Sequence, residues 1–578
     1  GTRWVGTPIA DLTAAAATDL KRGNLERNSV GGTVTLAAQG GILMADGATI
    51  DVSGGAVTYA PTPVVASQLI EGGRVVDIAS ADPSVAYSGV FGTYSVSHIK
   101  WGPVDQWSLF NGGGALSPGY VEGKDAGAIR IAAPRLSLAG ELLGSTRIGL
   151  FQRNATTLPI DDPLARPYDQ LPRRGQLQIG VAVADDERQP RFVTPDVSFL
   201  SSVRQLLPDN FDPLTSALPD SLRRVALDTA WFGDEGLGEL TLFSDGTVEL
   251  PASSALRMGP LGRLKVVAGH IRLDGTIEAP AGRIDVLARQ TSNPEYLAAS
   301  DGSITLGARA SIDVSGLWTN DLAAGGLALP EPSGADLPNA GSIRLLAQQV
   351  APGDAGLLLA SGSTLRADGG AYVSPKGKLV AGTGGSLVLA ARSDPFGVRF
   401  PANFRLAGSL SAFGLRQGGS LALNASSVCI ALECGASLAT RVDLAPDFFQ
   451  SRGFSSFDIT ATGGGLDVLA GTQVALRQLN LLPAGDFLAR PSGTDVRTFS
   501  TPELLADSLR KPVNLKLTVK AENTTNQFSN ADLLAAGFLD IGAGSALLAD
   551  PGANVSLSSE TRLRLDGTVE APGGQITA

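Results

Sequence analysis

Two cysteines, Cys429 and Cys434, are the only thiols in this 578-residue chain, and they stand five positions apart. In an extended strand, side chains five positions apart point to opposite faces, so a disulfide between them requires a bend in the chain. Gly435 is compatible with such a bend. We therefore expect a disulfide, which fits export through an oxidising compartment. The alternative is two small buried side chains.

Carboxylates and histidines give little support for catalysis. Adjacent aspartates occur at 161–162 and 185–186, in a stretch rich in proline and charge where a solvated turn is the ordinary explanation. The chain has only two histidines, His98 and His270, so a Ser–His–Asp triad has few residues to draw on. We expect no enzyme activity, no metal site and no cofactor. A polysaccharide lyase or glycoside hydrolase is the alternative, since such enzymes use clustered carboxylates.

The best candidate for a binding surface is a group of aromatic residues between positions 56 and 125. Exposed tryptophan and tyrosine side chains are favoured at protein and carbohydrate contacts. The alternative is a local core that fixes this stretch to the rest of the chain. The candidate residues are Tyr87, Phe91, Tyr94, Trp101, Trp107 and Phe110.

The charge balance restricts the partners. Lysine and arginine number 45 against 56 aspartates and glutamates, which gives a net charge of −11. Nucleic acid is therefore not expected as a partner, because phosphate binding needs a basic surface. No apolar stretch reaches about 18 residues without a charge or a turn residue, so we expect no transmembrane helix.

A short glycine-led unit recurs along the chain and predicts the elements that position these residues. Its pattern is Gly-x-φ-x-φ-x-Ala, where φ is Val, Ile or Leu. Apolar residues at every second position predict short strands with one face in a core and the other in water. Copies occur at Gly32–Ala38, Gly127–Ala133, Gly282–Ala288, Gly341–Ala347, Gly385–Ala391 and Gly419–Ala425.

A longer repeat supports the same interpretation. Leu273–Ile284 (LDGTIEAPAGRI) and Leu565–Ile576 (LDGTVEAPGGQI) match at nine of twelve positions. A single unit cannot bury its apolar face, whereas stacked units bury a continuous column. We therefore predict an all-β fold, a right-handed parallel β-helix (solenoid) with inserted loops and small subdomains. A β-sandwich of hairpins is the alternative, because six Asp-Gly pairs are typical of hairpin turns.

The repeat also divides the chain. We expect β-helix coils at 1–55, 126–149, 236–439, 461–476 and 537–578. Four insertions interrupt them: an aromatic-rich one at 56–125, one rich in proline and charge at 150–235, a phenylalanine-rich one at 440–460 and a partly helical one at 477–536. The two helices expected in the last insertion span Pro502–Arg510 and Asn530–Ala536.

These units resemble the repeats of filamentous haemagglutinins, the large exoproteins of bacterial two-partner secretion. The resemblance rests on Gly32–Gly41 (GTVTLAAQGG), Gly302–Gly316 and LDGTIEAPAGRI; the segments Gly119–Gly127 and Phe448–Phe454 are also similar to parts of some members. It implies a β-helical shaft, export through an outer-membrane transporter, and a place outside the cell or on the bacterial surface. It also implies roles in adhesion, aggregation or biofilm, by contact with a host-cell or bacterial surface receptor or glycan.

Two sequence features known from the family are missing from this chain. It lacks the Asn-Pro-Asn signature of the family's secretion domain, so we expect an internal shaft region. It also lacks an Arg-Gly-Asp triplet, so one adhesion mode of the family has no support. The stalk of a contact-dependent toxin exoprotein is a further alternative to the adhesin shaft.

Overall fold

The structure of the chain is a computed structural model. It describes residues 24, 28–64, 68–77, 81–82, 84–91, 93–98, 100–108, 115–117, 119–149, 152–153, 170–183, 191–192, 194–201, 207, 211–212, 214–233, 235–291, 293–294, 296, 300–322, 337–353, 356–393, 400–521 and 537–578.

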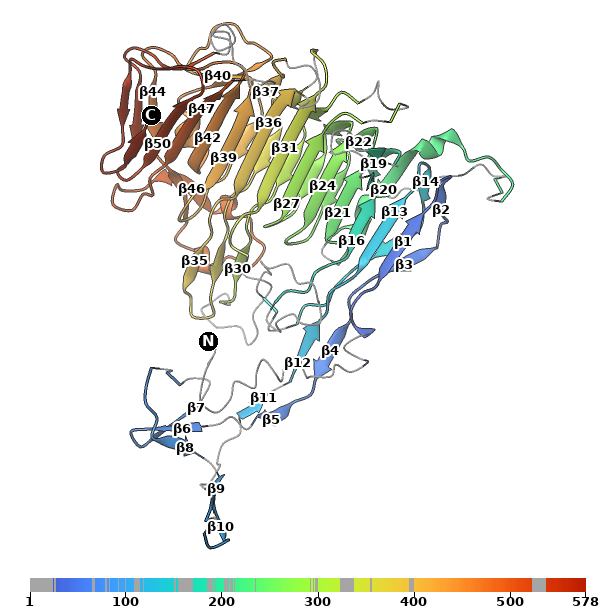
Figure 1. Cartoon of the computed structure of the whole chain (residues 1–578), viewed down its shortest axis with the longest axis vertical. Coiled ribbons are helices and arrows are strands. Elements are labelled where there is room, and N and C mark those ends of the chain that lie inside the picture. The colour runs from blue at the N-terminus through green and yellow to red at the C-terminus, as the bar shows by residue number, and fades with distance from the viewer. Residues whose placement is uncertain are drawn as a thin grey trace.

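One long parallel sheet gathers strands from the whole length of the chain (Figure 1). Its strands lie side by side in chain order, from β1, drawn in blue, to β50, drawn in red, and β53 follows β50 as the last strand. They are β1 (Thr33–Ala37), β13 (Ala128–Ala132), β16 (Gln176–Ile179), β21 (Glu239–Phe243), β24 (Arg263–Ala268), β27 (Arg283–Ala288), β31 (Ser342–Gln349), β36 (Ser386–Ser393), β39 (Gly419–Ala425), β42 (Phe454–Thr462), β47 (Asn514–Lys520), β50 (Asn554–Ser559) and β53 (Gln575–Thr577).

Between successive strands of the long sheet, the chain forms strands of two shorter parallel sheets. The second sheet contains β20 (Arg224–Asp228), β19 (Asp196–Leu200), β22 (Thr247–Leu250), β25 (His270–Leu273), β28 (Ser303–Leu306), β32 (Leu357–Leu359) and β37 (Phe404–Leu406). The third sheet contains β23 (Ala255–Arg257), β26 (Thr276–Glu278), β29 (Ser311–Asp313), β33 (Thr364–Arg366) and β38 (Ser409–Ser411). The chain thus runs through the three sheets in the same order several times, and each such circuit is here called a pass.

The same arrangement continues toward both ends. On the C-terminal side, one sheet holds β41 (Arg441–Leu444), β40 (Ser427–Ile430), β43 (Leu466–Val468), β48 (Leu539–Ile541) and β51 (Leu563–Leu565), and another holds β44 (Gln473–Leu476), β49 (Ala546–Ala549) and β52 (Thr568–Glu570). On the N-terminal side, β14 (Leu136–Leu138) pairs with β2 (Ile42–Met44), and β15 (Glu141–Leu143) pairs with β3 (Thr49–Asp51).

The core is a set of apolar rows that run from strand to strand. In the long sheet, one register row consists of Leu240, Leu264, Ile284, Ile343, Leu387 and Leu421, all of them buried. Burying one such side chain contributes about 1.5–3 kcal/mol. The neighbouring row, which includes Thr241, Lys265 and Asp285, points to the other face. The alternation read from the sequence is therefore the inward and outward alternation of this sheet.

The leading glycine of the repeat has a steric reason. Each of these glycines lies directly beside the corresponding glycine of the preceding pass: the amide of Ser342 donates to the carbonyl oxygen of Gly282 at 2.9 Å, and that of Ser386 to Gly341 at 3.1 Å. A Cβ at Gly341 would lie 1.8 Å from the oxygen of Gly282, and one at Gly419 would lie 1.9 Å from that of Gly385. Only glycine fits at this position in these central passes, whereas Ser455, Val513 and Ala553 occupy it nearer the C-terminus.

The prediction of an all-β fold is confirmed. Adjacent strands of the three main sheets run parallel, which contradicts the β-sandwich of hairpins, because hairpin partners are antiparallel. The Asp-Gly pairs do not mark hairpins in this core: Gly275, after β25, lies in a turn between two strands of different sheets.

The structure differs from the predicted division at three places. Strands of the parallel sheets occur in three of the expected insertions: β16, β19 and β20 lie within 150–235, β41 lies within 440–460 and β42 begins there, and β47 lies within 477–536. The unit at 175–181 ends in Val181 in place of alanine. The unit at β42 carries a bulge, since Phe454 pairs with Gly419 and Ser456 with Ser420. The extra residue hides the repeat from a pattern of fixed spacing.

The helix predicted over Pro502–Arg510 is wrong. Ser500–Leu504 forms strand β46, which pairs antiparallel with β45 (Leu479–Pro483). In this pairing the backbone groups of β46 have hydrogen-bond partners in β45. An isolated short helix would have to form its first turn, which is unfavourable in free energy. The second predicted helix, Asn530–Ala536, lies outside the described residues.

Two outgrowths leave the stack of sheets. The first, here called the arm, spans 56–123 and begins as two antiparallel pairs, β4 (Ala56–Tyr59) with β12 (Tyr120–Gly123) and β5 (Thr62–Val64) with β11 (Ala115–Ser117). Beyond them lie β6 (Gln68–Glu71), β7 (Arg74–Asp77), β8 (Gly89–Phe91), β9 (Thr93–Ser97) and β10 (Val104–Ser108). The arm points away from the long sheet, with β9 and β10 at its far end (Figure 1).

The second outgrowth, here called the side body, lies against the flank of the stack. It consists of β30 (Trp318–Asn320), β34 (Ala371–Val373), β35 (Leu379–Ala381), and β45 and β46 with the loop 484–499 between them. A small apolar core of its own joins these parts, formed by Trp318, Ala371, Val373, Phe413, Leu481, Val496 and Phe499. The side body is thus a folded unit packed beside the stack.

The glycine ladder leads to a stability prediction. Gly341→Ala places a methyl group against the carbonyl oxygen of Gly282, and we expect it to lower the free energy of unfolding by about 1–3 kcal/mol, in the range of other overpacked sites. Gly32→Ala is the matched control: Gly32 has the same place in the first pass, and a Cβ there meets nothing within 4 Å. Urea unfolding of both variants checks this; equal midpoints would contradict the steric account.

Candidate functional site

The tip of the arm carries a tryptophan whose side chain is 74% exposed, Trp101. The turn that closes the β9–β10 hairpin holds its backbone, because the amides of Trp101 and Gly102 both donate to the carbonyl oxygen of His98, at 2.9 and 2.8 Å. Gly102 takes a φ of +79°, which this turn requires. The ammonium group of Lys100 lies 5.5 Å from the ring centroid of Trp101. A fixed turn therefore presents an indole and a cation to solvent.

The structure places the other predicted aromatic residues differently. Tyr94 and Trp107 are register partners in the same hairpin, and Phe91 ends β8. Tyr87 is half-buried, and its hydroxyl donates to the carbonyl oxygen of Asp82 at 2.9 Å, which fits the local-core alternative. Phe110 lies outside the described residues.

The base of the arm is the part that fixes its direction. The rings of Tyr59 in β4 and Tyr120 in β12 stack with their centroids 4.8 Å apart. Next to them, Gly119 takes a φ of +72°, and a Cβ there would lie 2.6 Å from the carbonyl oxygen of Tyr59. The two antiparallel pairs and this stacked pair of rings give the arm a two-stranded stalk.

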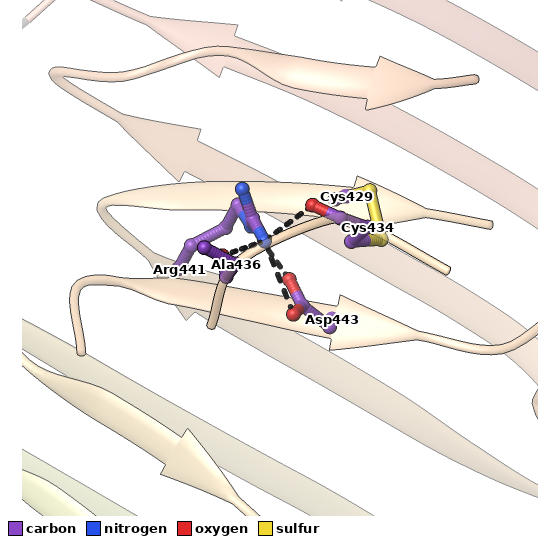
Figure 2. Close-up of a disulfide and its surroundings, with 5 residues drawn as sticks. All are labelled: Cys429, Cys434, Ala436, Arg441 and Asp443. Atoms are coloured by element: carbon purple, nitrogen blue, oxygen red, sulfur yellow. Dashed lines mark hydrogen bonds and ion pairs between the residues drawn. A yellow bond between two sulfur atoms is a disulfide. The ribbon is translucent and has the colours of Figure 1, made fainter. Parts of the chain in front are cut away.

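A disulfide joins Cys429 and Cys434, with their Cα atoms 6.1 Å apart (Figure 2). Cys429 is buried in β40, which ends at Ile430, and the chain then bends to bring Cys434 back. Arg441 braces this loop, since its Nη2 atom donates to the carbonyl oxygens of Cys434 at 2.7 Å and Ala436 at 2.9 Å (Figure 2). Leu432 at the turn is 84% exposed.

The same place contains the only grouping of metal-ligand side chains found in the described part of the chain. The sulfur atoms of Cys429 and Cys434 and a carboxylate oxygen of Asp443 lie within 4.8 Å of one another. Metal ligation by cysteine requires a thiolate, and these sulfurs are bonded to each other. Asp443 is instead paired with Arg441, at 2.6 Å. The grouping therefore functions as a covalent and ionic staple.

A serine, a histidine and an aspartate meet at the start of β25 and β28, which sequence reasoning missed. The Nδ1 atom of His270 lies 2.9 Å from Oγ of Ser303 and 3.0 Å from Oδ1 of Asp301. In a catalytic triad, the serine and the carboxylate contact opposite nitrogens of the ring. Here both contact the same nitrogen, and the Ser303 hydroxyl donates to Asp301 at 2.5 Å. The cluster ties two strands together and lacks the geometry of a nucleophile.

This cluster shifts the titration of its carboxylate. Burial acts to raise the pKa of Asp301, but the hydrogen bonds from His270 and Ser303, and the charge of His270, outweigh it and hold the pKa below its ordinary value. Asp301 therefore contributes stability while it is ionised.

Ion pairs fasten the side body to the third sheet. Arg366 in β33 binds Asp313 in β29 at 2.7 Å through Nε, and Asp495 of the side-body loop at 2.8 Å through Nη1. A second pair joins Arg497 of this loop to the buried Asp368 at 3.2 Å. Burial raises the pKa of Asp368, while Arg497 acts in the opposite direction. These pairs are partly buried, and they link the loop to two successive passes.

The aspartate pairs considered for catalysis, Asp161–Asp162 and Asp185–Asp186, lie outside the described residues. Within the described part, no helix is long and apolar enough to cross a membrane. Comparison with protein-family models, with curated proteins and with solved structures gave no match to this chain.

The staple around Cys434 predicts a local effect. For a loop of this size, chain entropy gives the disulfide about 2 kcal/mol of stabilisation, so Cys434→Ser should lose this amount and release residues 431–440. Hydrogen exchange followed by mass spectrometry should show faster exchange in 431–440, with β43 unchanged. Wild-type protein treated with a reductant should behave in the same way; unchanged exchange after reduction would contradict the prediction.

The shifted pKa of Asp301 predicts a dependence on pH. Because its folded-state pKa lies below the unfolded value of about 3.9, the unfolded chain binds more protons in this window, and acidification costs stability. Wild-type protein should melt at a higher temperature than Asp301→Asn near pH 6. This difference should shrink as the pH falls below about 4 and through the lowered pKa. A difference that stays constant down to the lowest pH would contradict the assignment.

Proposed function

We propose that this chain is the shaft of a secreted bacterial surface adhesin of the filamentous-haemagglutinin type, built as a right-handed parallel β-helix. The support for this shape is the order of the passes, in which the long, second and third sheets are visited in turn over the range from β21 to β39. Such a stack supplies a continuous hydrogen-bonded ladder, which makes a stiff spacer. Its function would be to hold contact surfaces away from the cell.

The observation that carries the adhesin proposal is Trp101. A large apolar side chain that points into solvent from a well-held backbone marks a candidate contact surface. Tryptophan is among the residues that contribute most of the binding energy at protein interfaces. Trp101 meets these conditions at the end of an arm that stands off the stack (Figure 1). An arm of this kind suits contact with a receptor or glycan on a host cell or on another bacterium.

The proposed setting follows from the disulfide and the resemblance of the repeats. Disulfides persist in oxidising surroundings, so Cys429–Cys434 supports export and an extracellular or cell-surface location. Two-partner secretion through an outer-membrane transporter is the route that the repeats imply. Attachment, aggregation and biofilm formation are the processes we assign to the protein, with no enzymatic step. The stalk of a toxin exoprotein would share this shaft.

Display on a non-adhering bacterium tests this proposal. We expect the displayed chain to retain cells on epithelial monolayers or to cause cell–cell aggregation. Trp101→Ala should lower retention about tenfold or more, as loss of an interface tryptophan does. Leu432→Ala is the matched control, since Leu432 is similarly exposed but lies on the stack, and it should not change retention.

Two results would count against the proposal. Unchanged attachment of the Trp101→Ala variant would show that the tip of the arm does not contact the receptor or glycan. Release of reducing ends or unsaturated products from acidic polysaccharides, by the purified chain, would favour the lyase or hydrolase in place of an adhesin.

A further inference from the structure

A groove of about 580 Å³ runs along the corner where the chain enters the long sheet, and it ends against the side body. Successive passes contribute to its floor, from Thr146 and Leu171 through Gly238 and Leu261 to Pro280. Its far end is closed by Trp318 of β30 and by the loop residues Ser492 and Gly493. Neither the arm nor the disulfide loop takes part in it, so it is separate from the surfaces described above.

The end wall of the groove is firmly held. The amide of Gly493 donates to the carbonyl oxygen of Trp318 at 2.9 Å, and the amide of Asn320 donates to Oγ of Ser492 at 2.8 Å. The indole N–H of Trp318 donates to the carbonyl oxygen of Arg490 at 3.1 Å. A wall fixed in this way loses little freedom when a ligand binds, which favours affinity.

The floor contains a residue with a strained backbone, Leu261, whose side chain the turn itself does not require. Leu261 takes a φ of +62° at the third position of the turn 259–262, and Ala281 takes +53° in the turn 279–282 of the next pass. These are the only residues other than glycine with positive φ in the described part of the chain. The equivalent turns near the C-terminus, 550–553 and 571–574, have Gly552 and Gly573 at this position.

The comparison of these turns points to a role for the leucine side chain. A residue with a Cβ pays roughly 1–2 kcal/mol in this conformation, and glycine avoids that cost. The hydrogen bonding is the same in both places, since the amide of Leu261 donates to the carbonyl oxygen of Pro280 at 2.8 Å and that of Gly552 to Pro572 at 2.8 Å. The turn therefore does not need leucine. What Leu261 adds is an apolar wall of the groove. Strain of this kind is typical of functional sites.

The charges around the groove favour an anionic ligand. Arg173, Arg174 and Arg263 line it, against the single carboxylate of Glu239, in a chain whose net charge is −11. Gly238 and Gly259 make room for Arg174, since a Cβ on Gly259 would fall on its guanidinium group. Arg263 is exposed and lies 3.6 Å from Glu239.

We propose that this groove binds an extended peptide segment of a partner protein that combines aliphatic and acidic side chains. Aliphatic side chains would contact the wall formed by Leu261, Leu171 and Ile148, and a carboxylate would pair with Arg263. At the strand spacing of about 4.8 Å, four steps between the five passes that line it make the groove about 19 Å long, which fits about six extended residues.

The lining distinguishes a peptide from a glycan. Sugar rings are favoured by exposed aromatic faces, and among the described lining residues the only aromatic one is Trp318, which is 2% exposed. Aliphatic residues and prolines make up most of the apolar wall. An oligosaccharide acid would find the positive charge but no ring to stack on.

The test is binding of the whole chain to an array of acetylated, amidated heptapeptides in which aliphatic and acidic positions vary independently. We expect the bound peptides to contain both kinds of residue and to lose binding when Asp or Glu is replaced by Asn or Gln. The best peptide is then titrated in solution against wild-type protein and variants.

Matched variants from adjacent passes provide the controls. Leu261→Gly removes the apolar wall and relieves the strained turn, so we expect at least about tenfold weaker binding with no loss of thermal stability. Ala281→Gly relieves the same strain one pass away, outside this groove, and should leave binding unchanged. Arg263→Gln should weaken binding about fivefold, whereas Arg283→Gln, its register partner, should not.

Three results would overturn the proposal. They are an array without selection for aliphatic and acidic residues, equal loss of binding in Leu261→Gly and Ala281→Gly, and displacement of the peptide by a galacturonate hexamer that binds with higher affinity. The proposal is independent of the adhesin function, because Leu261→Gly should leave Trp101-dependent attachment intact.

Discussion

The spacing between successive passes of the chain is the constraint on which the rest of this structure depends. Neighbouring strands must lie about 4.8 Å apart for the parallel hydrogen bonds to form. At the entrance to the long sheet this brings the backbones of Gly282, Gly341, Gly385 and Gly419 so close that a Cβ would collide with a carbonyl oxygen. Close backbone contact thus selects glycine at these positions, and the apolar rows behind them supply the burial that stabilises the stack.

The loops and insertions outside the stacked sheets are not restricted by this spacing. A pass can be lengthened wherever its turn faces solvent, because loop closure costs little more for a long loop than for a short one. The arm leaves between β3 and β13, and the side body is assembled from outgrowths of several passes, with Trp318 and Phe499 in contact at 4.8 Å between ring centroids although they are far apart in the sequence. A regular core is therefore compatible with irregular and specialised surfaces.

This difference explains how much could be predicted from the sequence. Alternation and glycine spacing are local, so the all-β class and most strands of the long sheet could be predicted, and the cysteines drew attention because they are the only two. The bulge at Phe454 and the strand at Ser500–Leu504 depend on partners distant in the chain, which local patterns do not contain. The cluster at His270 and the groove at Leu261 required residues from several passes, although the paired motifs Pro260–Arg263 and Pro280–Arg283, twenty residues apart, marked the place.

The two strained turns extend this reasoning from packing to function. Glycine, which adopts the left-handed region without strain, holds the third position in the equivalent turns at Gly552 and Gly573 and in other turns of the stack at Gly362, Gly471 and Gly544. Leu261 and Ala281 depart from this pattern in adjacent passes, and only the larger of the two lies in the groove beside the side body. In a repeat protein, each position can be compared with the same position in the other copies. A residue that strains the backbone in one copy, where other copies have glycine, therefore identifies a copy whose surface has a role beyond supporting the stack.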